Sequence, residues 1–535
     1  MRRLRFYIIT LVAFISVLVL LSYFLISTSF VARLASQQLS KLTSYSISIG
    51  KIHYSVTNFY ELALDDVVIS DKNQEITTIP KLIIDLDKDN IWQLHHFNSI
   101  TVINGVINDT GEIKYDISTD SLKLIDSMVN VPINNEKEKF SLQQVNGSVK
   151  PFSLSNQNKY QFDLTSQQVL YNQTSIKSAL VQGFYQDGVT YITNLNGNIN
   201  DGFFEAKLKI LADNSLDINQ LKINNVHFQL TDEIDIEQLP AIFKKFTIHQ
   251  FKMLDSSIQL PSISIEKGNI EATNINYDKQ WNFEQSSLAF NAENIVWNNE
   301  IFSSVLLQLK SQEDMVTIEK AMANWSKGNF RFTGSWQDDL LKINQITFTD
   351  VDYQLPEKLE SLILPDIFSQ IEIDTLTILP GRLIRTNSEF PFFFNNFEMS
   401  GSNLSLVKDR KLGLYSGSLF FKAESGSINR IDIRYPDLVM KFDDNDCAIL
   451  NFSSLISQGG MLEVIATVNP SLTEFLKFKF NAYAVTSLLL EEWKLVNKPP
   501  KAINYTVDLH GDIVPFGFSG TFSADGNDYV ITREH

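Results

Sequence analysis

Hydrophobic and polar residues alternate along most of this chain in short runs. Clear examples are residues 45–52, 81–87, 205–211, 316–322, 428–435 and 476–485. Such runs recur about every 8–14 residues, with Asn, Asp, Gly or Ser between them, which is typical of successive β-strands. The pattern predicts a mainly β protein with a few short helices.

One pattern of fifteen residues occurs twice, 125 positions apart. LDINQLKINNVHFQL (Leu216 to Leu230) and LKINQITFTDVDYQL (Leu341 to Leu355) share seven identical residues and all seven apolar positions. Further similarity extends the internal repeat to residues 216–254 and 341–379. The run ITVINGVI (100–107) also resembles FKMLDSSI (251–258) and LTILPGRL (376–383), which indicates a third, weaker copy.

The apolar positions of each copy share one strand face only if the alternation changes phase twice. The changes fall at Asn219–Gln220 and Asn224–Asn225 in the first copy, and at Asn344–Gln345 and Thr349–Asp350 in the second. Phase changes of this kind indicate β-bulges or bends, and Asn and Asp tolerate the backbone angles that bends require. We therefore expect a long, twisted antiparallel sheet of repeated multi-strand units, apolar on one face.

No series of amphipathic helices is present to cover that face, so the sheet is expected to roll into a groove. Such a groove either closes on itself as a core or holds lipid acyl chains. A chain of roughly 16 carbons costs on the order of 12 kcal/mol in water, at about 0.8 kcal/mol per methylene. The candidate groove residues are Leu216, Ile218, Val226, Phe228, Leu230, Leu341, Ile343, Val351, Tyr353 and Leu355.

The start of the chain reads as a membrane anchor. Residues 6–26 carry no charge and follow Arg2, Arg3 and Arg5. A helix of this length spans a bilayer, and the arginines place residues 1–5 in the cytoplasm and residues 27–535 outside it. A cleaved signal peptide is the alternative, but its apolar core is usually shorter. Two further helices are predicted, at 29–42 and 486–495.

Charge and motifs give no sign of catalysis. The formal net charge is −17 and no basic tract follows the N-terminus, which argues against nucleic acid as a partner. His95 and His96 are neighbours, but adjacent strand residues face opposite ways, so no metal site is expected. Cys447 is the single cysteine, which excludes an intramolecular disulfide. Catalytic motifs are missing, so we expect no cofactor, no metal and no enzyme activity.

The order of these features resembles the AsmA family of Gram-negative envelope proteins, and most closely its YicH-like members. The resemblance is carried by an anchor followed by residues 36–71, 141–153, 328–362, 411–438 and 482–513. It covers nearly the whole chain and rests on strand patterns, with no catalytic motif.

The resemblance implies an inner-membrane anchor through residues 6–26 and a periplasmic body. It implies a repeating β-groove, related to TamB-like and bridge-type lipid-transfer proteins, and a role in phospholipid transport or outer-membrane homeostasis. The chain is shorter than the members proposed to bridge both membranes, so a bridge would need a protein partner in the periplasm or the outer membrane. The alternative is a non-catalytic scaffold that assists outer-membrane protein assembly without carrying lipid.

Overall fold

The fold is that of a computed structural model. It describes residues 12–17, 28–42, 45–54, 58, 60–71, 74–87, 95–108, 117–133, 138–153, 159–171, 174–229, 245–355, 368–386, 391–442, 447–457, 459–470, 474–483, 504–512, 517–524 and 527–533. The chain divides into two units, residues 1–228, 234–256 and 275–282 in the first, and residues 229–233, 257–274 and 283–535 in the second.

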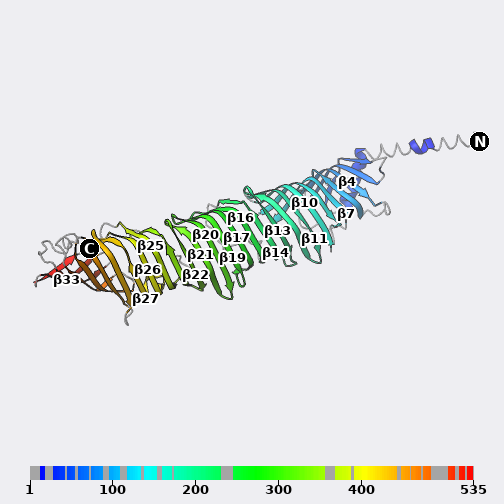
Figure 1. The fold of residues 1–535 in the computed structure, drawn as a ribbon. Coiled ribbons are helices and arrows are strands. Elements are labelled where there is room, and N and C mark those ends of the chain that lie inside the picture. Colours follow the sequence, from blue (N-terminus) through cyan, green and yellow to red (C-terminus); the bar gives the residue numbers. More distant parts are fainter. Residues whose placement is uncertain are drawn as a thin grey trace, which may run out of the picture. The chain divides into compact units, whose positions relative to one another are not determined.

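The first unit contains one helix and a series of strands that lie side by side in chain order (Figure 1). Its elements are α2 (Ser29–Leu42), β1 (Ser46–Ser48), β2 (Lys51–Tyr54), β3 (Glu61–Asp71), β4 (Gln74–Leu86), β5 (His96–Ile103), β6 (Val106–Asn108), β7 (Ser118–Ile133), β8 (Glu138–Lys150), β9 (Phe152–Ser153), β10 (Lys159–Tyr171), β11 (Thr174–Gln186), β12 (Val189–Ile199), β13 (Gly202–Ile210), β14 (Leu216–Asn224), β15 (His227–Gln229), most of β16 (Lys245–Gln259), and β18 (Gln280–Asn282).

The second unit is built in the same way. Its strands are most of β17 (Ile263–Asp278), β19 (Ser287–Trp297), β20 (Glu300–Gln312), β21 (Met315–Trp325), β22 (Gly328–Gln337), β23 (Leu340–Thr349), β24 (Asp352–Gln354), β25 (Gln370–Arg385), β26 (Phe392–Lys408), β27 (Lys411–Lys422), β28 (Ser425–Ile428), β29 (Ile431–Phe442), β30 (Ala448–Ile456), β31 (Met461–Val468), β32 (Glu474–Tyr483), β33 (Asn504–Asp512), β34 (Gly517–Ala524) and β35 (Asn527–Arg533). The chain is therefore mainly β, as predicted.

The prediction of a purely antiparallel sheet is wrong, because each unit also contains parallel pairs. In the first unit β5 and β6 run parallel to β7, and β14 runs parallel to β16. In the second unit β23 and β24 run parallel to β25. Two neighbouring strands can run parallel only if the connection between them crosses back to the end at which the first strand began. The connecting residues 109–116, 230–244 and 356–367 lie outside the described part of the chain.

The repeated sequence forms these parallel pairs. In the first copy Leu216 pairs with Phe246, and in the second copy Leu341 pairs with Ile371, so both pairs have the same offset of 30 residues. A bend follows β14 at Asn225 and β23 at Asp350. The φ angles of these two residues are 51° and 54°. The repeat in the sequence is therefore a repeated strand–bend–strand element with a parallel partner.

A third copy exists, but its position in the unit differs from the predicted alignment. Asn104, with φ of 55°, ends β5 as Asn225 ends β14. The N–H of Asn104 bonds to the carbonyl of Ile125 at 2.9 Å, and that of Asn225 bonds to Leu254 at 2.9 Å. Residues 100–107 therefore correspond to residues 221–228, on the first strand of the pair, and not to residues 251–258 on the second.

The predicted phase changes within the strands are confirmed as bulges. Opposite β13, the register of β14 skips Asn219, because Lys207 pairs with Gln220 and Leu208 pairs with Ile218. Opposite β22, the register of β23 skips Asn344 in the same way. A bulge bends its strand and restores the inward direction of the following apolar side chains. Both halves of the strand thus contribute to the same face.

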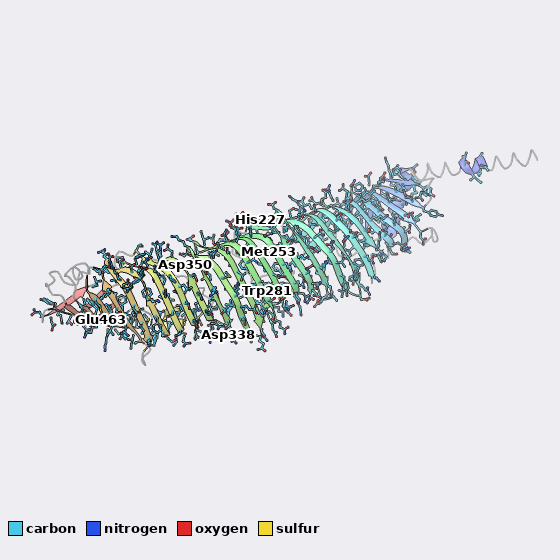
Figure 2. The ribbon with its side chains drawn as sticks, viewed as in Figure 1. His227, Met253, Trp281, Asp338, Asp350 and Glu463 are labelled. Atoms are coloured by element: carbon cyan, nitrogen blue, oxygen red, sulfur yellow. The ribbon has the colours of Figure 1, made fainter. Side chains whose placement is uncertain are left out.

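In each unit this face, which we call the apolar face, carries the core. In the first unit its buried residues are Ile49, Ile52, Leu64, Val67, Ile79, Val102, Leu124 and Val145, with Ala32 of α2 against them. In the second unit they are Ile343, Ile346, Ile371, Ile373, Leu376, Leu404, Val407 and Leu414, with smaller groups around Phe397 and Ala466. Figure 2 shows that side chains also project from the other face of the strands.

The N-terminal predictions are resolved only in part. Helix α2 has the predicted bounds, 29–42. Of the expected span 6–26 the structure describes residues 12–17, which are helical, and the remainder lies outside the described residues. Among the helices that the structure describes, none combines the length and the apolar character needed to cross a membrane. The helix predicted at 486–495 also lies outside the described residues.

Candidate functional site

The apolar face is the candidate ligand-binding surface of this molecule. A sheet face lined with Ile, Leu, Val and Phe is normally covered by a second layer. In the described chain the one helix packed on strands is α2, which contacts β1 and β2. Elsewhere many apolar side chains keep partial exposure, among them Leu82, Leu142, Leu164, Phe332, Leu341, Phe348 and Ile378. This arrangement leaves apolar surface available to a ligand with hydrocarbon chains.

The predicted groove residues of the first copy lie along β14 and β15. Leu216 and Ile218 are half-buried and pair with Phe246 and Ile248 of β16. Val226 is fully buried and Phe228 is half-buried, whereas the side chain of His227 between them is exposed. Alternation therefore places Val226 and Phe228 on one face and His227 on the other. Leu230 lies outside the described residues.

The predicted residues of the second copy lie along β23 and β24 and the position after them. Leu341 packs against the core cluster and Ile343, 7% exposed, belongs to it. Val351 is 5% exposed, and Tyr353 and Leu355 are half-buried. The structure thus brings Ile343 and Val351 to buried positions of the apolar face, with the half-buried Leu341 packed against the cluster of Ile343. Of the predicted residues that the structure describes, those of the first copy belong to the first unit and those of the second copy to the second.

Aromatic rings extend the apolar face beside the second copy. Tyr353 lies 4.8 Å from Trp325 and Trp325 lies 6.3 Å from Phe348, measured between ring centroids. Phe302 and Phe330 complete the group, 6.2 Å apart. Burial, and then the charge of Glu300, raise the pKa of the Tyr353 hydroxyl, so this group is neutral and can donate a hydrogen bond at the margin of an apolar surface.

The opposite face of the strands is polar and carries several ion pairs. Lys342, between Leu341 and Ile343 in β23, lies 3.6 Å from Asp374. In the first unit Asp217 of β14 bonds to His249 at 2.7 Å and to Lys209 at 3.4 Å. Burial alone would raise the pKa of Asp217, but these two hydrogen bonds outweigh it and lower that pKa. Charged residues are thus segregated from the apolar face.

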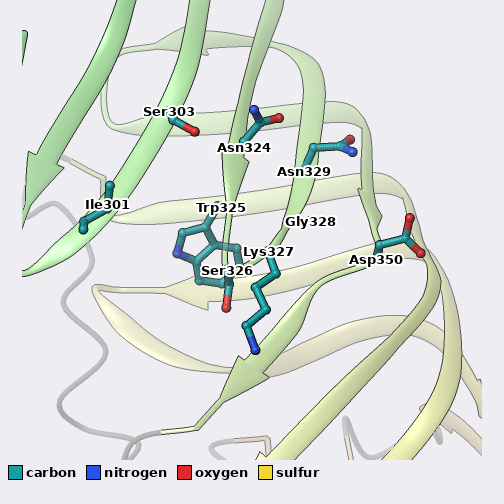
Figure 3. Close-up of a pocket in the computed structure, with 9 residues that line it drawn as sticks. All are labelled: Ile301, Ser303, Asn324, Trp325, Ser326, Lys327, Gly328, Asn329 and Asp350. Carbon is teal, nitrogen blue, oxygen red and sulfur yellow. The ribbon is translucent and has the colours of Figure 1, made fainter.

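A depression of about 540 Å³ lies in the second unit and differs from the apolar face in chemistry (Figure 3). Ser303, Asn324 and Asn329 line it from neighbouring strands. Lys327 and Asp350 contribute the charged groups of its lining. Trp325 of the aromatic group and Ile301 also line the depression, so it borders the apolar face. Its polar and charged groups do not suit a hydrocarbon chain.

Sequence reasoning missed the partner strands of each repeat. Met253, 3% exposed on β16, and Leu376 and Leu404, 8% and 1% exposed on β25 and β26, line the same face as the predicted residues. Their signal was present, since they belong to alternating runs, but the antiparallel assumption gave no reason to place them beside β14 and β23.

The described residues also contain no group of three or more His, Cys, Asp and Glu side chains that could hold a metal ion. His96 contacts Ser118 at 2.9 Å and Asp120 at 3.5 Å, and His53 contacts Asp65 at 2.7 Å. Each of these histidines therefore has a simple polar partner across the sheet. The structure describes His95 and His96 on consecutive positions, of which only His96 belongs to β5.

Comparison with known proteins gives one informative match. No family model matches the chain. The chain is 23% identical over 490 residues to the AsmA family protein YicH of Escherichia coli (strain K12), which covers 88% of this chain and 84% of that protein. A similarity that spans nearly the full length of both chains, together with the β-rich fold, supports membership of this chain in the AsmA family.

Proposed function

We propose that this protein binds lipid acyl chains on its apolar face and takes part in phospholipid transport or outer-membrane homeostasis. The observation that carries the proposal is a single-layer face of Ile, Leu, Val and Phe, much of it only half-buried, on strands that repeat the same geometry. Each methylene removed from water on this face contributes about 0.8 kcal/mol. The energetic cost of carrying an acyl chain through water is thereby offset.

The proposed location is the inner membrane of a Gram-negative cell, with residues 6–26 as a single span and the rest of the chain in the periplasm. This rests on the uncharged run after Arg2, Arg3 and Arg5 and on the family. The proposed role is non-catalytic, in keeping with a face that offers hydrocarbon contact rather than reactive groups. A periplasmic or outer-membrane protein is the expected further partner.

The test is photocrosslinking in cells with p-benzoylphenylalanine at neighbouring positions on opposite faces. Phe228 and Tyr353 lie on the apolar face, and His227 and Gln354 are their exposed neighbours on the polar face. We expect phospholipid adducts at Phe228 and Tyr353 and none at His227 and Gln354. Because the pairs differ by one residue, expression level and location are matched.

Two results would contradict the proposal. Equal lipid labelling on both faces would show nonspecific contact with membranes. Protein adducts without lipid at Phe228 and Tyr353 would favour the scaffold that assists outer-membrane protein assembly.

A further inference from the structure

Helix α2 presents two different apolar surfaces, and only one of them is used within the described chain. Its inner surface holds Ala32, which is fully buried, together with Val31 and Ala35. These residues pack against the first-unit core cluster, which includes Ile49 and Ile52. The helix therefore covers the beginning of the apolar face.

Two serines fix the orientation of α2 on the sheet. Ser36 Oγ accepts a hydrogen bond from the N–H of Ile49 at 2.9 Å, and Ser40 Oγ accepts one from the N–H of Ile47 at 2.8 Å. Both donors belong to the segment of β1 and the residue after it, so the serines satisfy backbone groups at a sheet edge. These bonds and the contacts of Ala32 hold one side of α2 against the sheet. The opposite side of the helix therefore faces away from the sheet.

The outer surface of α2 combines large apolar side chains with positive charge. Phe30 is 63% exposed and Leu34 is 44% exposed, and residues four apart lie on the same side of a helix. Arg33 and Lys41 are also exposed. The helix contains no acidic residue, in a chain whose formal net charge is −17. Local charge of opposite sign to the rest of the molecule indicates an anionic partner.

The apolar residues before α2 point to a bilayer as that partner. In the described helical segment 12–17, Val12, Phe14, Ile15 and Val17 are all more than half exposed. Helices that lie in a membrane interface pair aromatic and leucine side chains with Lys and Arg, as α2 does. Anionic phospholipids attract such basic side chains near the surface.

We propose that the outer surface of α2 lies on an anionic phospholipid surface. Phe30 and Leu34 enter the boundary between head groups and acyl chains, and Arg33 and Lys41 contact phosphates. This rests on the proposed function and extends it, because α2 then sets the first strands of the apolar face directly beside the lipids from which acyl chains are taken. The helix thus has one surface for the sheet and one for the membrane.

The position of α2 can be measured in the full-length protein reconstituted in vesicles of zwitterionic lipid with about 30% anionic phosphatidylglycerol. Leu34→Cys and Ser48→Cys are each labelled with the fluorophore NBD, in a background in which Cys447 is replaced by Ser. Ser48 is an exposed β1 residue close to α2 in the chain and serves as the control for tethering alone. The quencher is a phospholipid with a nitroxide near the top of its acyl chain.

We expect the Leu34 probe to be quenched at least threefold more strongly than the Ser48 probe, and less strongly when the anionic lipid is omitted. Equal quenching at the two positions would overturn the proposal, since it would reflect tethering alone. Strong quenching at Leu34 that does not respond to anionic lipid would overturn the assigned role of Arg33 and Lys41.

A second measurement links the helix to lipid uptake. Phe30→Ser combined with Leu34→Ser removes the outer apolar pair, and Gln37→Ser combined with Gln38→Ser is the matched control on exposed polar positions of the same helix. The first variant should reduce phospholipid crosslinking at Phe228 by roughly tenfold, with an unchanged melting temperature, and the control should not. Unchanged crosslinking in the first variant would contradict this inference, whereas no lipid at Phe228 in the parent protein would contradict the proposed function itself.

Discussion

The side-chain oxygen of Ser256 lies 3.1 Å from the backbone nitrogen of Val226 and accepts its hydrogen bond across a parallel strand pair. Ser127 accepts the N–H of Gly105 at 3.2 Å in the same position of another copy. Both serines are almost fully buried. In these two copies the bend that follows the first strand of the pair leaves a backbone N–H without its regular ladder partner, and a serine hydroxyl supplies the missing acceptor. In the β23–β25 pair the position that corresponds to Ser256 is Gly381, so the device is not shared by all three copies.

Replacing Ser256 with Ala should therefore destabilise the first unit. The change removes only the hydroxyl oxygen and leaves a buried N–H of Val226 without an acceptor, which costs about 1–3 kcal/mol. The urea concentration at half-unfolding, followed by intrinsic fluorescence, should fall. Gln259→Ala, at an exposed position of the same strand, is the control. An unchanged midpoint for the Ser256 variant would show that the hydroxyl is dispensable.

Deleting Asn344 should be far more damaging than substituting it. Without the bulge residue, the alternation after it shifts by one position, so that Ile346 and Phe348 turn to the polar face. Each large apolar side chain lost from a buried site costs about 1.5–3 kcal/mol. The deletion variant is expected to lose protease resistance in the second unit, whereas Asn344→Gly should retain it. Equal resistance of both variants would argue that the bulge does not set the face.

Ile218→Asp and Ile343→Asp should fail in different ways. Ile343 is 7% exposed within a core cluster, and a carboxylate buried there without a partner should unfold the second unit. Ile218 is half-buried on the apolar face, so the charge retains water and the unit should remain folded. Native mass spectrometry should show less bound phospholipid for the Ile218 variant. Full lipid content in a folded Ile218 variant would exclude this part of the face from binding.

The stability of the second unit should depend on pH through Asp352. A hydrogen bond from Lys327 at 2.9 Å, together with the ion pair to Arg382, lowers the pKa of Asp352, whose side chain is 14% exposed. Because the folded-state pKa is depressed, the contribution is complete above the unfolded value of about 3.9 and disappears as pH falls. It should be modest, about 1 kcal/mol or less, because both cations are solvent-exposed.

Asp352→Asn is the variant that measures this contribution. At pH 7 its urea midpoint should lie below that of the parent protein, and the difference should shrink as the pH falls from about 4 towards 2. Asp314→Asn, at an exposed turn position, is the control and should show little difference at any pH. A midpoint difference for Asp352→Asn that persists unchanged at the lowest pH would contradict the assigned cause.

Local features could be read from the sequence because they depend on neighbouring residues. The bounds of α2 and the bulges at Asn219 and Asn344 follow from periodicity alone. The placement of Val226 and Val351 at buried positions follows from the same alternation.

Strand direction could not be read in this way. A strand has the same apolar alternation whether its neighbour runs parallel or antiparallel. The parallel pairing of Leu216 with Phe246 could therefore not be predicted from the sequence. The same ambiguity explains the misaligned third copy. In a parallel pair, the hydrophobic alternation changes phase at paired positions of the two strands. Residues 100–107 therefore resemble the sequence of either strand.

The parallel pairs also divide the chain at regular intervals. Among the described strands, seven long ones run from β7 to β14 and seven from β16 to β23, each series starting as the second member of a parallel pair and ending as the first member of the next. At about 4.8 Å per strand, one series adds roughly 34 Å to a sheet. Because each series begins and ends with the same strand pairing, duplication of one series would add a fixed number of strands to a sheet without altering the pairing of the strands beside it.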